Sequence, residues 1–155
     1  LSTDTHTGTL VLKNGKIDVN ANGVIHGEVE IDMTTIIVTD MQGKWGKKLE
    51  GHLKSPDFFG VEKYPNAFIA FQSDENTIKN NQINLTGELT IKDITHPISF
   101  TAELLQKKPT LKAKASMSFD RSKYDVRFRS GKFFEDLGDK LILDDIEVDV
   151  LLVTN

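Results

Sequence analysis

The chain has 155 residues, of which 38% are hydrophobic and 27% charged, and its formal net charge is −4. This length suits a single domain with one core, which we place at residues 1–155. The sequence has neither an apolar run of about 20 residues, as a membrane-spanning helix requires, nor a dense Lys/Arg cluster, so we expect no membrane span and no nucleic-acid partner. It has no cysteine, which excludes disulfides, thiolate metal sites and cysteine nucleophiles.

Two Asn-Gly dipeptides near the start of the chain mark expected turns. The short extended runs 10–13 and 16–19 are joined by Asn14-Gly15, the dipeptide that best fits a two-residue type I′ turn. We therefore predict a hairpin over these two runs. Asn22-Gly23 repeats the same signal before the next run begins.

Most of the remaining chain carries the period-two alternation of half-buried strands. Residues 24–33 place Val29, Ile31 and Met33 on one side and acidic residues on the other, and the β-branched run 34–39 extends or bends that strand. Further strands are expected at 67–73, 83–92, 98–104, 111–119 and 141–153. Consecutive antiparallel strands with one apolar face predict a meander, and the short hairpins favour an up-and-down barrel over a sandwich.

The apolar spacing changes to a helical one between residues 41 and 53. Trp45, Leu49, His52 and Leu53 fall on one helical face, while the charged residues 47, 48 and 50 face away. We therefore predict a short amphipathic helix whose Trp45 face docks against the sheet.

Two phenylalanine pairs lie in segments that do not fit a regular strand. Phe58-Phe59 follows Ser55-Pro56, where Ser55 is expected to cap a short turn that Gly60 closes in a left-handed conformation. Phe133-Phe134 lies in a second irregular segment between strands. Both pairs are expected to turn toward the sheet, either as a lid or plug that lines a ligand site or as ordinary core at the barrel ends.

No pattern in the sequence supports catalysis or metal binding. The four histidines, His6, His26, His52 and His96, lack the close spacing that a zinc site needs. The carboxylates at 145, 147 and 149 alternate onto the solvent face of the last strand, and the nucleophile-elbow, zinc-protease and phosphate-loop motifs are absent. We therefore expect no enzymatic activity, no catalytic residue, no metal site and no cofactor.

Three stretches resemble the YceI-like family of lipocalin-like barrels. They are HLKSPDFFGVEKYP at 52–65, LTGELTIKDITHP at 85–97, and DRSKYDV at 120–126 followed by GDKL at 138–141. Their order and spacing match that family over most of the chain.

Two substitutions and the start of the chain depart from the family pattern. Asp93 stands where the family often has glycine, and Phe68 stands where it often has threonine. A further strand normally precedes the segment that matches residues 6–10, so we expect a barrel that is either open or completed by another chain. The resemblance implies a mainly β, lipocalin-like antiparallel up-and-down barrel of about eight strands with one or two short helices.

The resemblance also implies a function, which is to bind, sequester or transport a long apolar lipid such as a polyisoprenoid or quinone tail. It implies a periplasmic or secreted protein that carries a bound isoprenoid lipid, and it leaves the oligomeric state open, with a dimer as one option. The inward set includes small residues that leave volume for such a tail, namely Ala67, Gly87, Ala102, Ala113 and Ala115.

The ligand-contacting residues that we expect are apolar side chains on the inner face and in the two phenylalanine pairs. They are Leu10, Leu12, Val29, Ile31, Met33, Leu53, Phe58, Phe59, Ile69, Phe71, Leu89, Ile91, Phe100, Met117, Phe119, Phe133, Phe134, Val148 and Val150. The alternative is a secreted protein-interaction or stress-response module with a filled core and no ligand, in which exposed strand edges or the phenylalanine pairs contact a partner.

Overall fold

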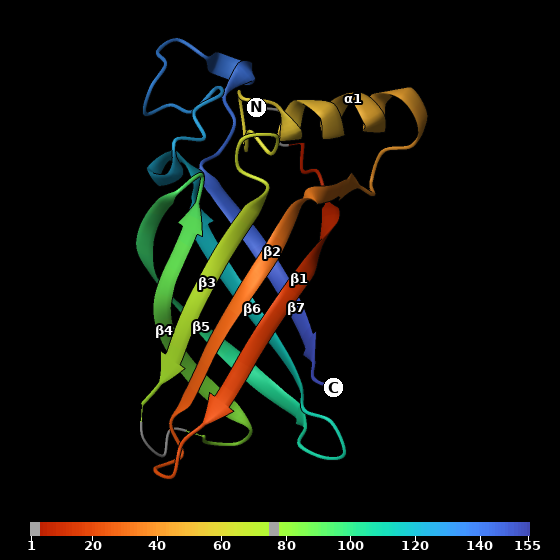
Figure 1. The fold of residues 1–155 in the computed structure, drawn as a ribbon. Helices are drawn as coiled ribbons and strands as arrows, with labels where there is room; N and C mark the ends of the chain where they lie inside the picture. Colours follow the sequence, from red (N-terminus) through yellow and green to blue (C-terminus); the bar gives the residue numbers. More distant parts are fainter. Residues whose placement is uncertain (1–3, 75–77) are drawn as a thin grey trace.

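The computed structural model describes residues 4–74 and 78–155. Seven strands form one antiparallel sheet in chain order (Figure 1). They are β1 (Gly8–Val19), β2 (Ile25–Val38), β3 (Asn66–Ser73), β4 (Gln82–Ile91), β5 (Ile94–Gln106), β6 (Lys112–Asp120) and β7 (Asp145–Val153), with one α-helix, α1 (Gly43–Lys54), and two short 3-10 helices, η1 (Arg121–Tyr124) and η2 (Gly138–Lys140).

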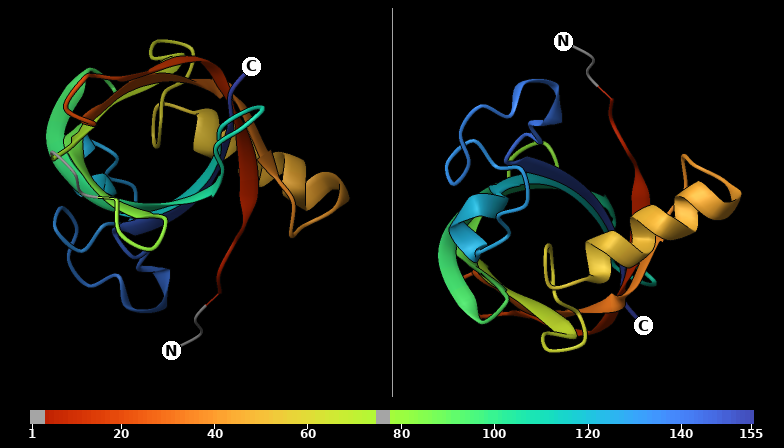
Figure 2. Two further views of the ribbon diagram at one scale, coloured as in Figure 1. Left: turned by 90° about the horizontal axis from the view of Figure 1, so that it is seen from below. Right: turned by 90° about the horizontal axis from the view of Figure 1, so that it is seen from above.

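The sheet curls until its two ends approach each other (Figure 2). Each strand pairs with the next one in the chain, whereas no strand pairing joins β1 to β7 among the described residues. This confirms the predicted antiparallel up-and-down barrel, built from seven strands and left open along the seam between β1 and β7. Both edge strands therefore keep a row of unpaired backbone groups.

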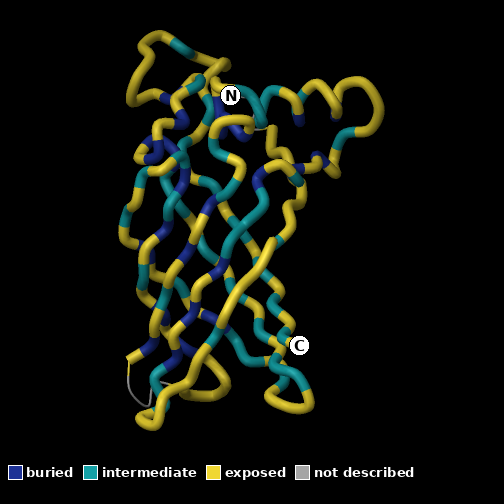
Figure 3. The backbone as a smooth tube through the Cα atoms, viewed as in Figure 1, coloured by how far each residue is buried: buried dark blue, intermediate teal, exposed yellow. Residues whose placement is uncertain are grey.

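Alternation along the strands follows the predicted parity. In β3, Ala67 and Ile69 are buried while Phe68 and Ala70 are exposed, and the same alternation runs through β4 to β7 (Figure 3). In β2 the parity shifts after Met33, because Met33 and Ile36 are both buried. The β-branched run that follows Met33 therefore bends the strand and still keeps an apolar residue inside.

Glycine allows the sheet to coil tightly at one point on the inner face. Phe71 lies between Gly27 on β2 and Gly87 on β4 in the strand ladders. A Cβ on Gly27 would lie 2.1 Å from the Phe71 ring, and one on Gly87 would lie 1.8 Å from the carbonyl oxygen of Ala70. Only glycine permits these approaches.

The predicted hairpin at Asn14-Gly15 is wrong, because β1 runs unbroken through both residues. Asn14 pairs with Glu30 and Gly15 with Val29 in the β1–β2 ladder, and Asn14 Nδ2 donates a hydrogen bond of 2.7 Å to Glu30 Oε2. The ladder shifts register between Leu12 and Asn14, so the dipeptide is absorbed as an irregularity within the strand. The full-length β1 satisfies far more of the backbone of β2 than a short hairpin would.

The chain turns instead at the second Asn-Gly dipeptide. Asn20 Oδ1 accepts backbone N–H groups from Asn22 at 2.9 Å and Val24 at 3.0 Å, and Gly23 takes a φ of +78°. The side chain of Asn20 thus organises the turn that joins β1 to β2.

The helix is confirmed, and Leu49, His52 and Leu53 are half-buried as predicted, but the expected positions of Trp45 and Glu50 are wrong. Trp45 is 62% exposed, whereas Glu50, expected to face solvent, is buried. Glu50 Oε2 accepts the backbone N–H of Val38 at 3.1 Å, and this bond, outweighing desolvation, lowers the pKa of the Glu50 carboxyl. A charged group that caps the end of β2 has therefore displaced the tryptophan from the interface.

The two ends of the barrel differ in construction. One end, called the helical end below, carries α1, residues 55–65, η1 and residues 125–144 (Figures 1 and 2). The opposite end, called the turn end, carries the β1–β2 and β5–β6 connections.

Candidate ligand-binding site

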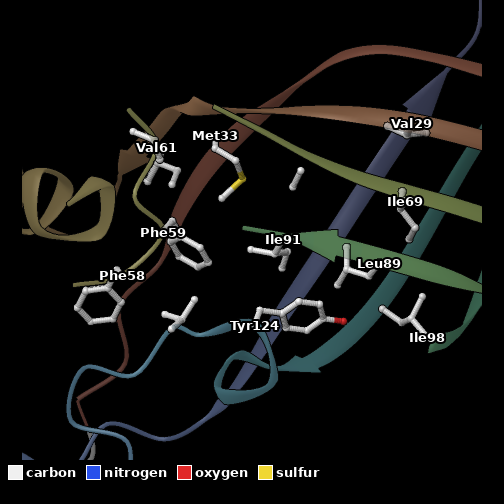
Figure 4. Packing of buried hydrophobic residues seen from close by; sticks show 13 residues of the cluster. Val29, Met33, Phe58, Phe59, Val61, Ile69, Leu89, Ile91, Ile98 and Tyr124 are labelled. Atoms are coloured by element: carbon white, nitrogen blue, oxygen red, sulfur yellow. The ribbon is translucent and has the colours of Figure 1, made fainter. Parts of the chain in front are cut away.

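The helical end of the barrel interior is filled by the segment that follows α1. Phe58 and Phe59 are buried and, with Val61, pack against Met33 of β2 and Ile91 of β4 (Figure 4). The first phenylalanine pair therefore turns toward the sheet, as predicted, and forms a buried plug at this end of the interior.

The backbone of this plug is held by a compact turn. The Ser55 carbonyl oxygen accepts N–H groups from Phe58 at 3.0 Å and Gly60 at 2.9 Å, and Gly60 has the expected left-handed φ of +54°. The Ser55 hydroxyl donates to the carbonyl oxygen of His52 at 2.6 Å, so its side chain ends α1 and does not cap the turn that follows. The ring of His52 lies edge-on to Phe58 at 4.9 Å and Phe128 at 4.4 Å, which makes this histidine part of the plug.

A buried arginine that the sequence did not single out holds the 126–143 segment, whose Val126 and Phe128 pack in the same cluster as Phe58 and Phe59. Arg121 is 1% exposed, and its guanidinium donates to the carbonyl oxygens of Val126 at 2.9 Å, Phe128 at 2.9 Å, Ile142 at 3.0 Å and Leu143 at 3.1 Å. Burial lowers its pKa, and the charges of Asp144 and Asp120 oppose that shift. This one side chain thus ties together both ends of the 126–143 segment and positions the fully buried Val126.

Asp120 orients the start of that segment. Its Oδ1 accepts the N–H of Ser122 at 2.9 Å and the Ser122 hydroxyl at 2.5 Å, and its Oδ2 accepts from Lys132. Burial opposes the charged carboxylate, but the hydrogen bonds from Lys132 and Ser122 outweigh it and lower the pKa of Asp120 to about 2. The only sequence signal for this arrangement is the Asp-Arg-Ser run directly after an apolar strand.

The inner face of β6 and β7 is covered less completely, although Met117, Phe119 and Ile146 pack against the margin of the core. Every inward side chain on these two strands is only half-buried, although its neighbours along the strand point outward to solvent. The half-buried residues are Ala113, Ala115, Met117 and Phe119 on β6, and Ile146, Val148, Val150 and Leu152 on β7. An apolar wall therefore faces the lumen and remains accessible to solvent.

The middle of this wall is lined by small side chains. Ala115 pairs with Ala102 on β5 and with Val150 on β7, and Ala113 pairs with Leu152 on the same side. Ala102 and Ala115 thus sit next to each other across the ladder, with Val150 beyond them. Ala102 is buried in a core cluster with Ile25, Ile83 and Leu85, and Ala115 packs partly buried against it, so the two alanines form a low stretch of the wall next to the larger Val150.

The structure sorts the expected ligand-contacting residues into four groups. Val29, Met33, Phe58, Phe59, Ile69, Leu89 and Ile91 are buried core, and Leu12, Ile31, Leu53, Phe71, Phe100, Met117 and Phe119 pack partly buried against it. Val148 and Val150 lie on the half-buried inner face of β7, and Leu10, Phe133 and Phe134 are exposed.

The three exposed members lie outside the buried interior. Leu10 on edge strand β1 is 42% exposed, and Phe133 and Phe134 are 42% and 49% exposed. The second phenylalanine pair does not turn toward the sheet, because both backbone N–H groups bond to the carbonyl oxygen of buried Ser130 at 3.1 Å and direct the segment outward.

Two hollows of about 450 and 520 Å³ lie outside the lumen. The first adjoins residues 131–141, and the second lies over the outer faces of β1 to β4. Neither is the apolar interior that the sequence predicts, so the half-buried wall of β6 and β7 is the candidate site. In residues 4–74 and 78–155 no three His, Asp or Glu side chains are grouped to hold a metal ion, and no helix there has the length and apolar character to cross a membrane.

Comparison with known proteins gives the same architecture. A family model described as the YceI-like domain matches residues 1–154. Over 54 residues the chain is 41% identical to UPF0312 protein plu2095 of Photorhabdus laumondii and 35% identical to Protein YceI of Escherichia coli O157:H7. Each of these matches covers 35% of this chain and only 27% of the relative's length.

Solved structures share the fold over a longer stretch. BcnA of Burkholderia cenocepacia superposes with a TM-score of 0.71 at 21% identity, covering 92% of this chain and 83% of that one. The YceI protein of Campylobacter jejuni gives a TM-score of 0.68 at 21% identity, covering 100% of this chain and 87% of that one. At this identity the likeness establishes the fold alone.

Proposed function

This chain belongs to the YceI-like family, and from that premise we propose that it binds a long apolar lipid of the isoprenoid type inside the barrel and sequesters or carries it. One observation carries the proposal. The inner face of β6 and β7 is apolar along its whole length and yet only half-buried, while the inner faces of β3 and β4 are largely covered by core.

The wall can supply the required affinity without any polar group. Burying one CH₂ group stabilises by about 0.8 kcal/mol, so a few isoprene units outweigh an association cost of several kcal/mol and reach roughly micromolar binding. The plug made by Phe58, Phe59 and Tyr124 closes the helical end, so we place the tail below it, along Met117, Ala115 and Val150.

Several features of this proposal follow from the family and the chemistry of the site together. From the family resemblance we propose a periplasmic or secreted protein. We also propose that it has no enzymatic activity, because the candidate site is lined by hydrocarbon side chains whose role is to hold apolar surface. The bound group is the lipid itself, and no metal or other cofactor takes part.

The test is extraction of the purified protein with organic solvent, followed by mass spectrometry of the extract. An isoprenoid lipid in near-stoichiometric amount supports carriage. A lipid-free extract, together with failure of the delipidated protein to take up added polyprenol, would overturn the proposal.

A second candidate rests on the two open sheet edges. Val11 on β1 is 58% exposed, and Leu151 and Val153 on β7 are 65% and 53% exposed. Unpaired edge strands with apolar side chains favour an interaction module that accepts a further strand from a partner. A shift from monomer to dimer with concentration, measured by sedimentation, would favour this second function, and it leaves the extraction experiment unaffected.

A further inference from the structure

The exposed aromatic side chains of the described residues gather toward the helical end. Trp45 of α1 is 62% exposed, and Phe133 and Phe134 of the 125–144 segment are 42% and 49% exposed. Phe68, 45% exposed on the outer face of β3, lies near the strand's start at the same end. Exposed aromatic rings in contiguous elements mark a surface that contacts something less polar than water.

A direct contact joins α1 to the segment that bears the phenylalanine pair. The His52 ring lies 4.4 Å from the Phe128 ring, centroid to centroid. Trp45, Leu49 and His52 recur at the spacing of one helical face, so Trp45 lies on the face of α1 that turns toward this segment. The start of α1, which bears Trp45, and the 125–144 segment, which bears the Phe133-Phe134 pair, thus both lie at the helical end, on either side of the barrel mouth (Figures 1 and 2).

The charge of this end is opposite to that of the whole chain. The chain has a net charge of −4, yet α1 carries four lysines against one glutamate. That glutamate is Glu50, whose carboxylate is buried against the backbone N–H of Val38. The solvent face of α1 is therefore uniformly cationic.

Cations sit on the aromatic rings of this end. Lys48 Nζ lies 5.3 Å from the centroid of the Trp45 ring, and Arg127 Cζ lies 4.6 Å from that of Phe133. The segment 125–144 also bears acidic residues, and Arg127 pairs with Asp125 at 2.5 Å, so the excess positive charge resides on α1. Aromatic rings next to lysines are the side chains that anchor proteins at the headgroup level of a bilayer.

We propose that the helical end is a docking surface for an anionic lipid membrane. The docking surface consists of Trp45, Phe133 and Phe134, which enter the headgroup region, and of Lys44 and Lys48, which contact anionic headgroups. A lipid bilayer suits these residues because the exposed rings are spread over two separate elements of the same end, and because the lysines complement negative headgroups. The inference goes beyond lipid binding in the barrel and holds whether or not the lumen carries a ligand.

The single tryptophan of the chain makes the test direct, because all tryptophan emission reports on Trp45. Unilamellar vesicles of phosphatidylcholine with an equal amount of phosphatidylglycerol are added to the full chain. Docking predicts a blue shift of the emission and quenching by lipids brominated near the headgroup. An unchanged emission spectrum at saturating vesicle concentration, or a blue shift produced by raising the protein concentration without vesicles, would overturn the proposal.

Variants separate the two kinds of contact, with vesicle co-sedimentation as the readout. Lys44→Gln with Lys48→Gln should weaken binding to anionic vesicles by roughly fivefold per lysine and leave the weak binding to pure phosphatidylcholine unchanged. Phe133→Ser with Phe134→Ser should weaken binding to both by on the order of tenfold. Leu105→Ser is the control, since this 48% exposed side chain lies near the end of β5 at the turn end, and its binding should equal that of the unmodified chain. Equal loss in the control and the docking-surface variants would contradict the assigned surface.

Discussion

The two halves of the barrel interior have the same sequence pattern and opposite packing. Inward residues on β3 and β4, such as Ile69 and Leu89, are buried at 7% and 4% exposure, whereas the inward residues of β6 and β7 are all half-buried. Ile69 and Leu89 are buried members of the core cluster that contains Phe58 and Phe59, whereas the β6 and β7 side chains that reach this cluster stay partly exposed at its margin. Alternation therefore fixes which face of a strand is inner, and a distant segment decides whether that face is filled.

The largest expected effect comes from removing the Arg121 guanidinium, which holds the segment that packs with the plug. Arg121→Met removes the donor to four carbonyl oxygens and leaves Asp144 beside a neutral side chain. We expect a loss of about 3–5 kcal/mol in the free energy of unfolding, measured by urea titration. Arg127→Gln, at a surface pair with Asp125, is the control and should cost about 1 kcal/mol or less. Comparable losses in the two variants would contradict the anchoring role.

A matched pair of methionines compares the two halves directly. Met33 is 7% exposed in the filled half, and Met117 is half-buried on the open wall. Met33→Ala should cost about 2–5 kcal/mol of unfolding free energy, and Met117→Ala should cost less than about 1.5 kcal/mol because it leaves a smaller cavity. Addition of polyprenol should raise the Tm of the unmodified protein by more than that of the Met117 variant. A Met117 loss as large as that of Met33 would mean that both halves are packed alike.

The acid dependence of stability tests the contribution of Asp120, which orients the segment that packs with the plug. The pKa of Asp120 is lowered to about 2 in the folded protein from its ordinary value of 3.8, so its contribution is present above about pH 4 and is lost as the pH falls toward 2. The full shift corresponds to about 2 kcal/mol, and solvent screening at this surface-accessible pair reduces it to about 1 kcal/mol.

Asp120→Asn should therefore be less stable than the unmodified chain at pH 7, and the difference should shrink between pH 4 and pH 2. Thermal unfolding followed across this range measures it, with Asp139→Asn as an exposed control. A difference that stays constant down to pH 2 would show that the hydrogen-bond partners of Asp120 do not lower its pKa.

The smallest expected effect comes from a substitution outside the barrel interior. Gly51 lies within α1, and a Cβ added there would meet nothing within 4 Å. Gly51→Ala should raise the free energy of unfolding by about 0.5–1 kcal/mol through helix propensity and leave lipid affinity unchanged. A change in lipid affinity would mean that α1 takes part in the site.

Much of the architecture was predictable from the sequence, since the alternation of β3 to β7 and the helix near residues 43–54 have strong local signals. The failures share a cause, which is competition from distant partners. Asn14-Gly15 suits a turn, but the long β2 offers a better ladder, and Trp45 suits a buried face, but Glu50 takes the contact with Val38. In both cases the local residue preference is real, but a contact with a distant strand outweighs it.

The candidate site was predictable only in part, because its openness depends on contacts far apart in the chain. The inner residues of β6 and β7 follow from parity, whereas the filling of the helical end of the interior depends on the fold of residues 55–65. The outward course of Phe133-Phe134 depends on bonds to Ser130 that a residue pattern does not encode. The burial of Arg121 left no signal beyond its place after a strand, in the DRSKYDV stretch that resembles the family.

The most direct test of a ligand site on the open wall is a titration of the delipidated protein with geranylgeraniol, monitored by calorimetry, for three forms of the chain. The unmodified protein should bind with roughly micromolar affinity. Ala115→Phe, which adds a ring to the wall beside Ala102 and Val150, should weaken binding at least tenfold, whereas Ala70→Phe on the exposed outer face should leave it unchanged. Full binding by the Ala115 variant, or loss of binding in the Ala70 variant, would show that the lipid does not lie along β6 and β7.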